Sequence, residues 1–297
     1  MILILDHTET EFSKNLRSVF DRRGEKTLLL TCEDIVRHTS TAFYLGAQRA
    51  GFRVQYKGHD FKASDIKGIY CGINAFTPYH FPHFSAEDAS FAALETQAFW
   101  LALLASLTCR VVNPPALDAL AGTYLSPAEF LFLAHSIGFH IPMVAYLESG
   151  ANAAEVYKAG VPARYSDLGK PWVEEINHDQ VNIRPMSENG DHFMVQENPA
   201  GTSVWVTIIG KQLVACELNA SGTIIETPKE QLPKLIRSRL LKLNNLLNLH
   251  VAEYIFKLRQ DGQWFLCGVT RPPQVSIMAY GEMIYHAIAD YILGSGG

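Results

Sequence analysis

Short apolar runs alternate with amphipathic segments along the first third of the chain. The runs at Ile2–Leu5 and Lys26–Thr31 are typical of buried strands, and the residues between them place apolar side chains at helical spacing. Two more strands are predicted at Gly51–Tyr56 and Ile66–Cys71. This alternation of strands and helices favours a parallel, Rossmann-like sheet in the N-terminal part of an α/β protein.

A long helix is predicted after the fourth strand, and an aromatic loop precedes it. Ser85 and Asp88 match a capping pair, and the helix is broadly apolar, so we expect it to be well buried. The loop Phe76–Phe84 contains His80 and His83, but its prolines disfavour a helix that would align them, so we expect a packed loop and no metal site. Because the loop follows a strand end, it is a candidate surface for a ligand or partner.

The C-terminal third is patterned as β-hairpins and amphipathic helices. We expect residues 194–273 to form one antiparallel sheet, backed by a leucine-striped helix over Pro228–Leu249. Thr227, Pro228 and Glu230 match a helix cap, a first helical residue and a capping-box acid, so this helix should begin there. A last helix is predicted near the C-terminus.

Composition narrows the class of protein. The chain has 297 residues, of which 48% are hydrophobic and 19% charged, which is typical of a globular protein of two or three compact units. The net charge of −5 gives no basic footprint for nucleic acid. The sequence shows no signal peptide and no apolar run long enough for a membrane span. Five cysteines, an odd number without a CxxC motif, favour reduced thiols, so we expect a cytoplasmic protein.

Three stretches stand out in order along the chain: Arg110–Pro142, Met194–Gly201 and Asp261–Pro273. Together they resemble the ATP-grasp superfamily near its glutathione-synthetase and ribosomal-protein-glutamate-ligase branches. Arg110–Pro142 is similar to the junction between the leading domain and the ATP-grasp module. Met194–Gly201 is similar to the hinge strand beside the adenine, and Asp261–Pro273 to the closing hairpin. The resemblance covers nearly the whole chain.

The resemblance implies a division of the chain into three parts. Residues 1–115 would form a Rossmann-like pre-ATP-grasp domain, and residues 116–196 a linker helix with a reduced lid subdomain. Residues 197–297 would form the C-terminal ATP-grasp-like α+β subdomain. We expect the lid to be shorter than is usual in the family.

The sequence departs from the family where the family holds Mg-ATP. ATP-grasp ligases bind Mg²⁺ with oxygen ligands, among them a Glu-x-Asn motif that here reads Gly268-Val269-Thr270. The partner acid on the preceding strand should fall near Ile255. Glu253, two residues away on the same face, is the candidate replacement.

The phosphate and adenine sides supply the remaining candidates. Arg164 stands where the family carries a lysine before its glycine-rich loop, and Lys170 ends a segment that has lost most of those glycines. Gln196 and Glu197 would lie at the hinge, where backbone groups could hold an adenine. With Glu253, these are the candidate cofactor-binding residues, and no catalytic residue is assigned.

Three functional hypotheses follow. The first is an ATP-grasp ligase homologue that has lost Mg-ATP catalysis and acts as a binding or partner subunit, without a cofactor. The second is an active ATP-dependent carboxylate–amine ligase that uses ATP and Mg²⁺ through relocated ligands. The third is an interaction protein with an empty nucleotide cleft that uses the loop Phe76–Phe84. The expected partner is a protein or a small-molecule carboxylate or amine.

Overall fold

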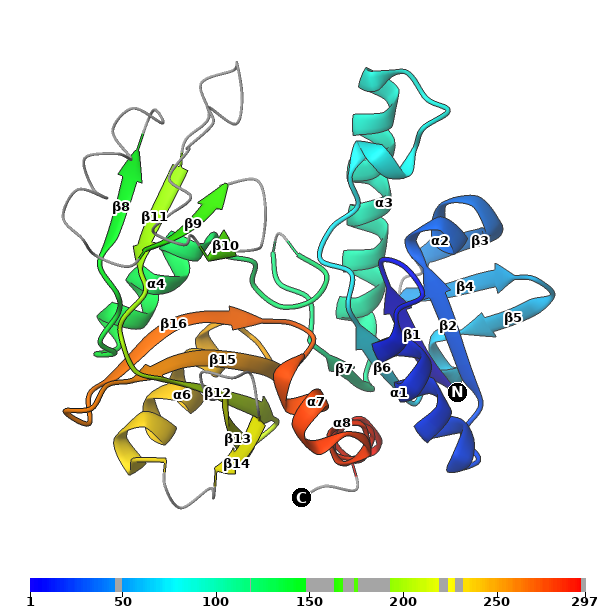
Figure 1. Ribbon diagram of the computed structural model, residues 1–297. Coiled ribbons are helices and arrows are strands. Elements are labelled where there is room, and N and C mark those ends of the chain that lie inside the picture. Colours follow the sequence, from blue (N-terminus) through cyan, green and yellow to red (C-terminus); the bar gives the residue numbers. More distant parts are fainter. Residues whose placement is uncertain are drawn as a thin grey trace.

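The computed structural model describes residues 1–45, 50–117, 119–147, 163–167, 174–175, 193–218, 224–227 and 232–294. Its first sheet has four parallel strands in the order β2-β1-β6-β7 (Figure 1). The strand bounds are β1 Ile2–Asp6, β2 Thr27–Thr31, β6 Gly68–Cys71 and β7 Arg110–Val112. The parallel sheet predicted from the apolar runs is confirmed.

Helices cover both faces of this sheet because successive residues of β1 point to opposite sides. Leu3 and Leu5 lie in a core with Trp100 of α3 (Ala86–Ser106). Ile2 and Ile4 lie in a second core with residues of α1 (Glu11–Arg22) and α8 (Glu282–Leu293). The chain therefore returns at its end to complete the core of its first sheet.

The predicted strand at Gly51–Tyr56 exists but belongs to a different sheet. It forms β4 (Ala50–Tyr56), which pairs antiparallel with β3 (Thr39–Leu45) and β5 (His59–Lys62). Its alternation explains the difference, because Phe52 and Val54 are buried while Arg53 between them is exposed. Such a pattern suits a sheet with one solvent face better than a doubly covered parallel sheet.

Helix α3 begins as predicted but is buried on only part of its surface. Ser85 caps it by accepting a hydrogen bond from the Asp88 amide at 3.2 Å. The expectation of a well-buried helix is wrong for Phe91 and Leu94, whose exposed fractions are 66% and 69%. Only one side of α3 packs on the sheet, and its far end projects beyond it (Figure 1).

The second large sheet is antiparallel, with the order β14-β13-β12-β15-β16. Helices α4 (Pro127–Ser136) and α6 (Lys234–Leu246) bury apolar side chains against one of its faces. The predicted sheet is thus confirmed for its hairpins and its helical backing. The strand bounds are β12 Thr202–Ile209, β13 Gln212–Leu218, β14 Ile224–Thr227, β15 Val251–Leu258 and β16 Trp264–Thr270.

Two details of that prediction are wrong. Strand β11 (Phe193–Glu197) is not part of the five-stranded sheet but of another, ordered β10-β9-β11-β8. Thr227 ends strand β14, where it pairs with Ala215, and α6 begins at Lys234. Residues 228–231, which include the predicted first turn, lie outside the described residues. The leucine-striped helix thus begins six residues later than Pro228, and the predicted capping by Thr227 stays a prediction.

The remaining elements connect the sheets. The other strands of the sheet that contains β11 are β8 Val144–Leu147, β9 Ala163–Asp167 and β10 Glu174–Glu175. Short helices are α2 Cys32–His38, α7 Val275–Tyr280 and the 3₁₀ turns η1 Ala63–Asp65 and η2 Pro78–His80. Among the described residues, no helix is both long and apolar enough to cross a bilayer. The three-part division of the chain and the reduced lid stay predictions.

Candidate functional site

The closing hairpin of the antiparallel sheet is formed by β15 and β16, as the sequence indicated. Ile255 lies opposite Gly268, and Glu253 lies opposite Thr270. A register shift separates Ile255 from Phe256. The three positions at which the resemblance leads us to expect metal ligands on this hairpin are thus the apolar Ile255, Gly268 and the neutral Thr270.

Glu253 is fully buried, and its carboxylate is surrounded by donors. One oxygen accepts hydrogen bonds from the backbone amides of Gln274 and Val275 at 2.8 and 3.1 Å. The other accepts from the Ser276 amide at 2.7 Å. The Thr207 and Thr270 hydroxyls add contacts at 3.3 and 3.4 Å. Glu253 therefore caps the first turn of α7, where the amide groups at a helix start favour an anion.

The hinge candidates are also engaged in protein contacts. The side chain of Gln196 is buried and donates to the Cys267 carbonyl at 3.0 Å, which ties β11 to β16. The Glu197 amide donates to the Met143 carbonyl at 2.8 Å, and the Glu197 carboxylate accepts from the Met143 amide at 3.1 Å. Because β11 lies between β8 and β9, its backbone is paired on both sides. An adenine held by hinge backbone stays a prediction, and it would need groups after Glu197.

The structure describes one of the two candidate phosphate-binding residues, Arg164. Arg164 lies on β9, where its backbone pairs with Gln196 of β11 and Glu175 of β10. Lys170 lies outside the described residues. The strand pairing brings Arg164 to the hinge, but Glu253 is on another sheet.

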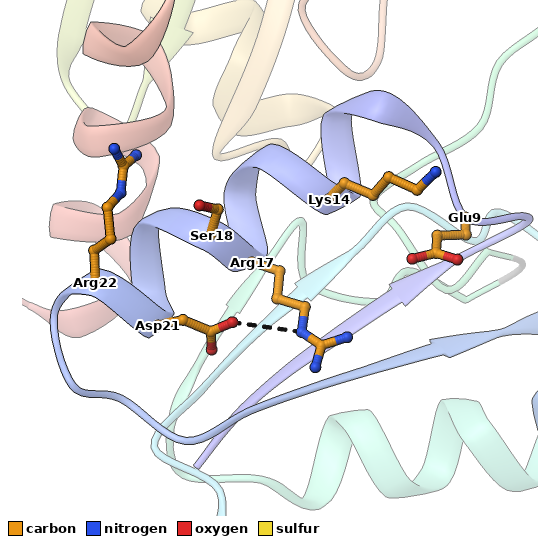
Figure 2. Close-up of a pocket in the computed structure, with 6 residues that line it drawn as sticks. All are labelled: Glu9, Lys14, Arg17, Ser18, Asp21 and Arg22. Carbon is orange, nitrogen blue, oxygen red and sulfur yellow. Dashed lines mark ion pairs between the residues drawn. The ribbon is translucent and has the colours of Figure 1, made fainter.

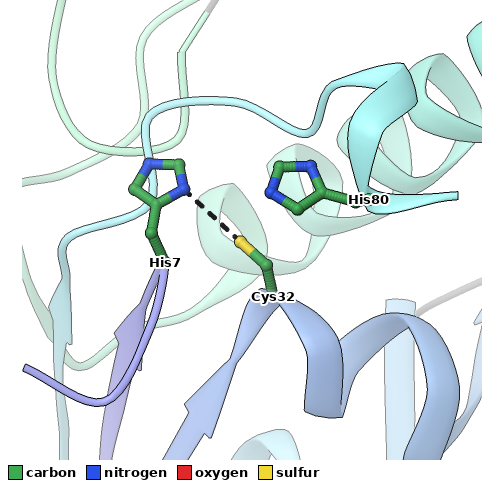
Figure 3. Close-up of side chains that lie close together, drawn as sticks. All are labelled: His7, Cys32 and His80. Atoms are coloured by element: carbon green, nitrogen blue, oxygen red, sulfur yellow. Dashed lines mark hydrogen bonds between the residues drawn. The ribbon is translucent and has the colours of Figure 1, made fainter. Parts of the chain in front are cut away.

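A second group of reactive side chains lies at the carboxyl edge of the parallel sheet. His7 follows β1, Cys32 follows β2, and His80 ends η2 in the loop after β6 (Figure 3). Their ligand atoms all lie within 4.8 Å of one another. The sequence analysis considered His80 only with His83, and the strand-end position of His7 and Cys32 was the signal that could have joined them.

Burial shifts the pKa values of His7 and Cys32 in opposite directions. Desolvation, the nearby His80 and, in the opposite sense, Asp6 set the pKa of His7, and the net effect lowers it. Burial, with a smaller contribution from Asp6, raises the pKa of the Cys32 thiol to about 12. The thiol is therefore not a ready nucleophile, because the thiolate is the reactive form.

Two surface features complete the description. A shallow depression along α1 is lined by charged side chains, among them Arg17 and Asp21, whose ion pair measures 3.6 Å (Figure 2). Exposed ion pairs of this kind contribute little and are typical of a solvated helix face. Four large apolar side chains, three aromatic and one aliphatic, are exposed on the loop before α3 and on α3 itself, and we call them the aromatic surface. Its members are Tyr79, Phe84, Phe91 and Leu94.

Comparisons of the sequence with family models and with curated proteins give no match. Comparison of the structure with solved structures does. The macrocyclase MdnC from Microcystis aeruginosa MRC, bound with precursor peptide MdnA, superposes with a TM-score of 0.73 at 12% identity over 100% of both chains.

Two further structures agree. A RiPP-associated ATP-grasp ligase from Chryseobacterium gregarium, in complex with ADP and a leader and core peptide, gives a TM-score of 0.72 at 14% identity, covering 100% of this chain and 97% of that one. A RimK domain protein ATP-grasp from Sphaerobacter thermophilus DSM 20745 gives 0.59 at 18% identity, with 99% of each chain covered. These superpositions, taken with the parallel sheet and the antiparallel sheets, show that this chain has the fold of the ATP-grasp superfamily.

Proposed function

We propose that this chain is an ATP-grasp homologue that does not hold Mg-ATP for catalysis and acts by binding a peptide or protein partner. The claim that the chain does not hold Mg-ATP rests mainly on the hydrogen bonds of the Glu253 carboxylate. Its carboxylate already accepts three backbone amide hydrogen bonds at the start of α7. A metal ion at this carboxylate would have to displace them.

The facing positions on the hairpin supply no replacement. Mg²⁺ requires oxygen ligands in near-octahedral geometry. Ile255 and Gly268 have no side-chain oxygen, and Thr270 offers a neutral hydroxyl that contacts Glu253. The side chains on this hairpin thus do not fit Mg-ATP.

Isothermal titration with ATP tests this half of the proposal. We expect no Mg²⁺-dependent binding, because loss of such charged contacts reduces affinity on the order of a thousandfold. A chain carrying Ile255→Asp, Gly268→Glu and Thr270→Asn should gain Mg²⁺-dependent affinity of at least about tenfold. The new side chain at Gly268 has room, since the nearest atom to an added Cβ is Ile255 Cδ1 at 3.7 Å.

A matched control carries Gly268→Gln instead of Gly268→Glu, with the other two changes kept. The glutamine side chain has nearly the same volume as glutamate but carries no charge. A micromolar dissociation constant for ATP in the unchanged chain, dependent on Mg²⁺, would refute the proposal and support an active ligase with relocated ligands.

The second half of the proposal rests on the aromatic surface. Tyr79 is 93% exposed and Phe91 66% exposed, and the turn that carries Tyr79 packs beside α3. Large exposed aromatic side chains on adjoining elements favour an interaction surface. The solved neighbours MdnC and the Chryseobacterium ligase are both bound with peptides, which supports a peptide or protein as the partner.

Photo-crosslinking in cells of the native host tests where the partner binds. A photoreactive amino acid at Tyr79 or Phe91 is expected to give a discrete crosslinked species. The same amino acid at Lys14, which is exposed on α1, should give none. Equal crosslinking at all three positions, or at none, contradicts the assignment of this surface.

A further inference from the structure

The parallel sheet brings three soft-metal ligands together from separate parts of the chain. Strands β2, β1 and β6 are neighbours, so their carboxyl ends lie at one edge. His7 and Cys32 directly follow two of these strands, and His80 comes from the loop after the third. The three side chains point toward one another (Figure 3).

The spacing already approaches that of a coordination sphere. In a tetrahedral zinc site, ligand atoms about 2.0–2.3 Å from the ion lie roughly 3.3–3.7 Å from each other. Cys32 Sγ and His7 Nδ1 are 3.5 Å apart. Since all three ligand atoms lie within 4.8 Å, His80 would have to move inward by only about 1 Å.

The contacts of His80 with Thr77 allow it to ligate a metal after a change of tautomer. Its Nδ1 accepts a hydrogen bond from the Thr77 amide at 2.9 Å, so the ring proton of the metal-free chain lies on Nε2, which faces Cys32 (Figure 3). Ligation through Nε2 moves that proton to Nδ1, ends the bond from the Thr77 amide and lets Nδ1 donate to the Thr77 carbonyl oxygen, 3.2 Å away. A histidine that ligates a metal through one nitrogen usually donates from the other to such an acceptor.

The surroundings of His7 show what binding would change. Its Nε2 accepts a hydrogen bond from the Asn74 amide at 3.3 Å, so the ring proton of the metal-free chain lies on Nδ1 and faces Cys32. Ligation through Nδ1 moves that proton to Nε2 and ends the long Asn74 contact. Binding also releases the Cys32 thiol proton to solvent, so one proton leaves per ion and no electron is transferred.

We propose that His7, Cys32 and His80 form a binding site for Zn²⁺. One thiolate and two imidazoles are ligands that suit zinc, and a fourth position would remain for water. Cys32 is buried and the two histidines are half-buried, so the ion would be shielded but reachable. The site is independent of the proposed function, and it would fasten the loop Phe76–Phe84 to the ends of β1 and β2.

Titration of the chelator-treated full chain with Co²⁺, a spectroscopic substitute for Zn²⁺, tests this site. We expect one ion per chain, a thiolate-to-cobalt charge-transfer band and the visible bands of tetrahedral cobalt, all removed by added Zn²⁺. Cys32→Ser should abolish the charge-transfer band. His80→Asn should weaken binding by at least about a hundredfold, more than is typical for loss of an outer-shell group.

Two controls separate this site from other thiols and imidazoles. His83→Asn changes an exposed histidine of the same loop, and Cys109→Ser changes a half-buried cysteine elsewhere, so both should bind cobalt unchanged. Circular dichroism shows whether each variant is folded. If Cys32→Ser does not fold, His80→Asn still tests the site. The proposal is overturned if the unchanged chain binds no stoichiometric cobalt, or if His80→Asn and His83→Asn bind it equally.

Discussion

Replacing Glu253 with alanine is expected to lower the free energy of unfolding by about 3–5 kcal/mol. The change removes the carboxylate acceptor of three backbone amides, those of Gln274, Val275 and the buried Ser276. It also leaves a cavity, because Glu253 is fully buried. Urea unfolding, extrapolated linearly to water, measures the loss.

Two variants locate the cause of that loss. Glu253→Gln keeps the volume and one acceptor oxygen, so it should cost less, about 2 kcal/mol. Glu95→Ala removes an exposed glutamate from α3 and should change stability by less than about 0.5 kcal/mol. If Glu253→Ala costs no more than Glu95→Ala, the carboxylate does not hold the start of α7, and Glu253 again becomes available as a metal ligand.

Asn113→Ala is expected to lower the free energy of unfolding by about 2–4 kcal/mol. Asn113 is buried after β7, and its Oδ1 accepts from the His250 and Val251 amides, both at 2.7 Å. Its Nδ2 donates to the Val251 carbonyl at 3.0 Å. One side chain thus fastens the end of the parallel sheet to the start of β15, and alanine leaves three buried backbone groups unpaired.

The matched control for Asn113 is Asn245→Ala, an exposed asparagine near the end of α6. Alanine is a better helix former than asparagine, so this variant should be neutral or slightly stabilising. Urea unfolding serves again, and hydrogen exchange should be faster at Val251 in the Asn113 variant alone. Equal stability of the two variants would mean that water replaces the Asn113 contacts.

Local pattern predicted most of the elements because it depends on neighbours in sequence. Apolar runs identified the strands of the parallel sheet, and a Ser-x-x-Asp pattern identified the start of α3. The order of motifs indicated the ATP-grasp fold that the solved structures support. The predicted start of α6 was wrong, since the helix begins at Lys234, while Thr227 ends strand β14 and pairs with Ala215.

The sequence by itself determined the strands, most helices, the superfamily resemblance and the absence of Glu-x-Asn from the closing hairpin, which reads Gly268-Val269-Thr270. Only the tertiary structure decided what the remaining polar residues contact. Glu253 receives its donors from α7 and from Thr207, and His80 meets His7 and Cys32 across three segments. Such contacts between distant segments depend on the strand order and on the path of the loops. The spacing of side chains along the sequence specifies neither. The exposed face of α3 has the same explanation. The composition of an apolar helix does not show which of its sides will pack against a sheet.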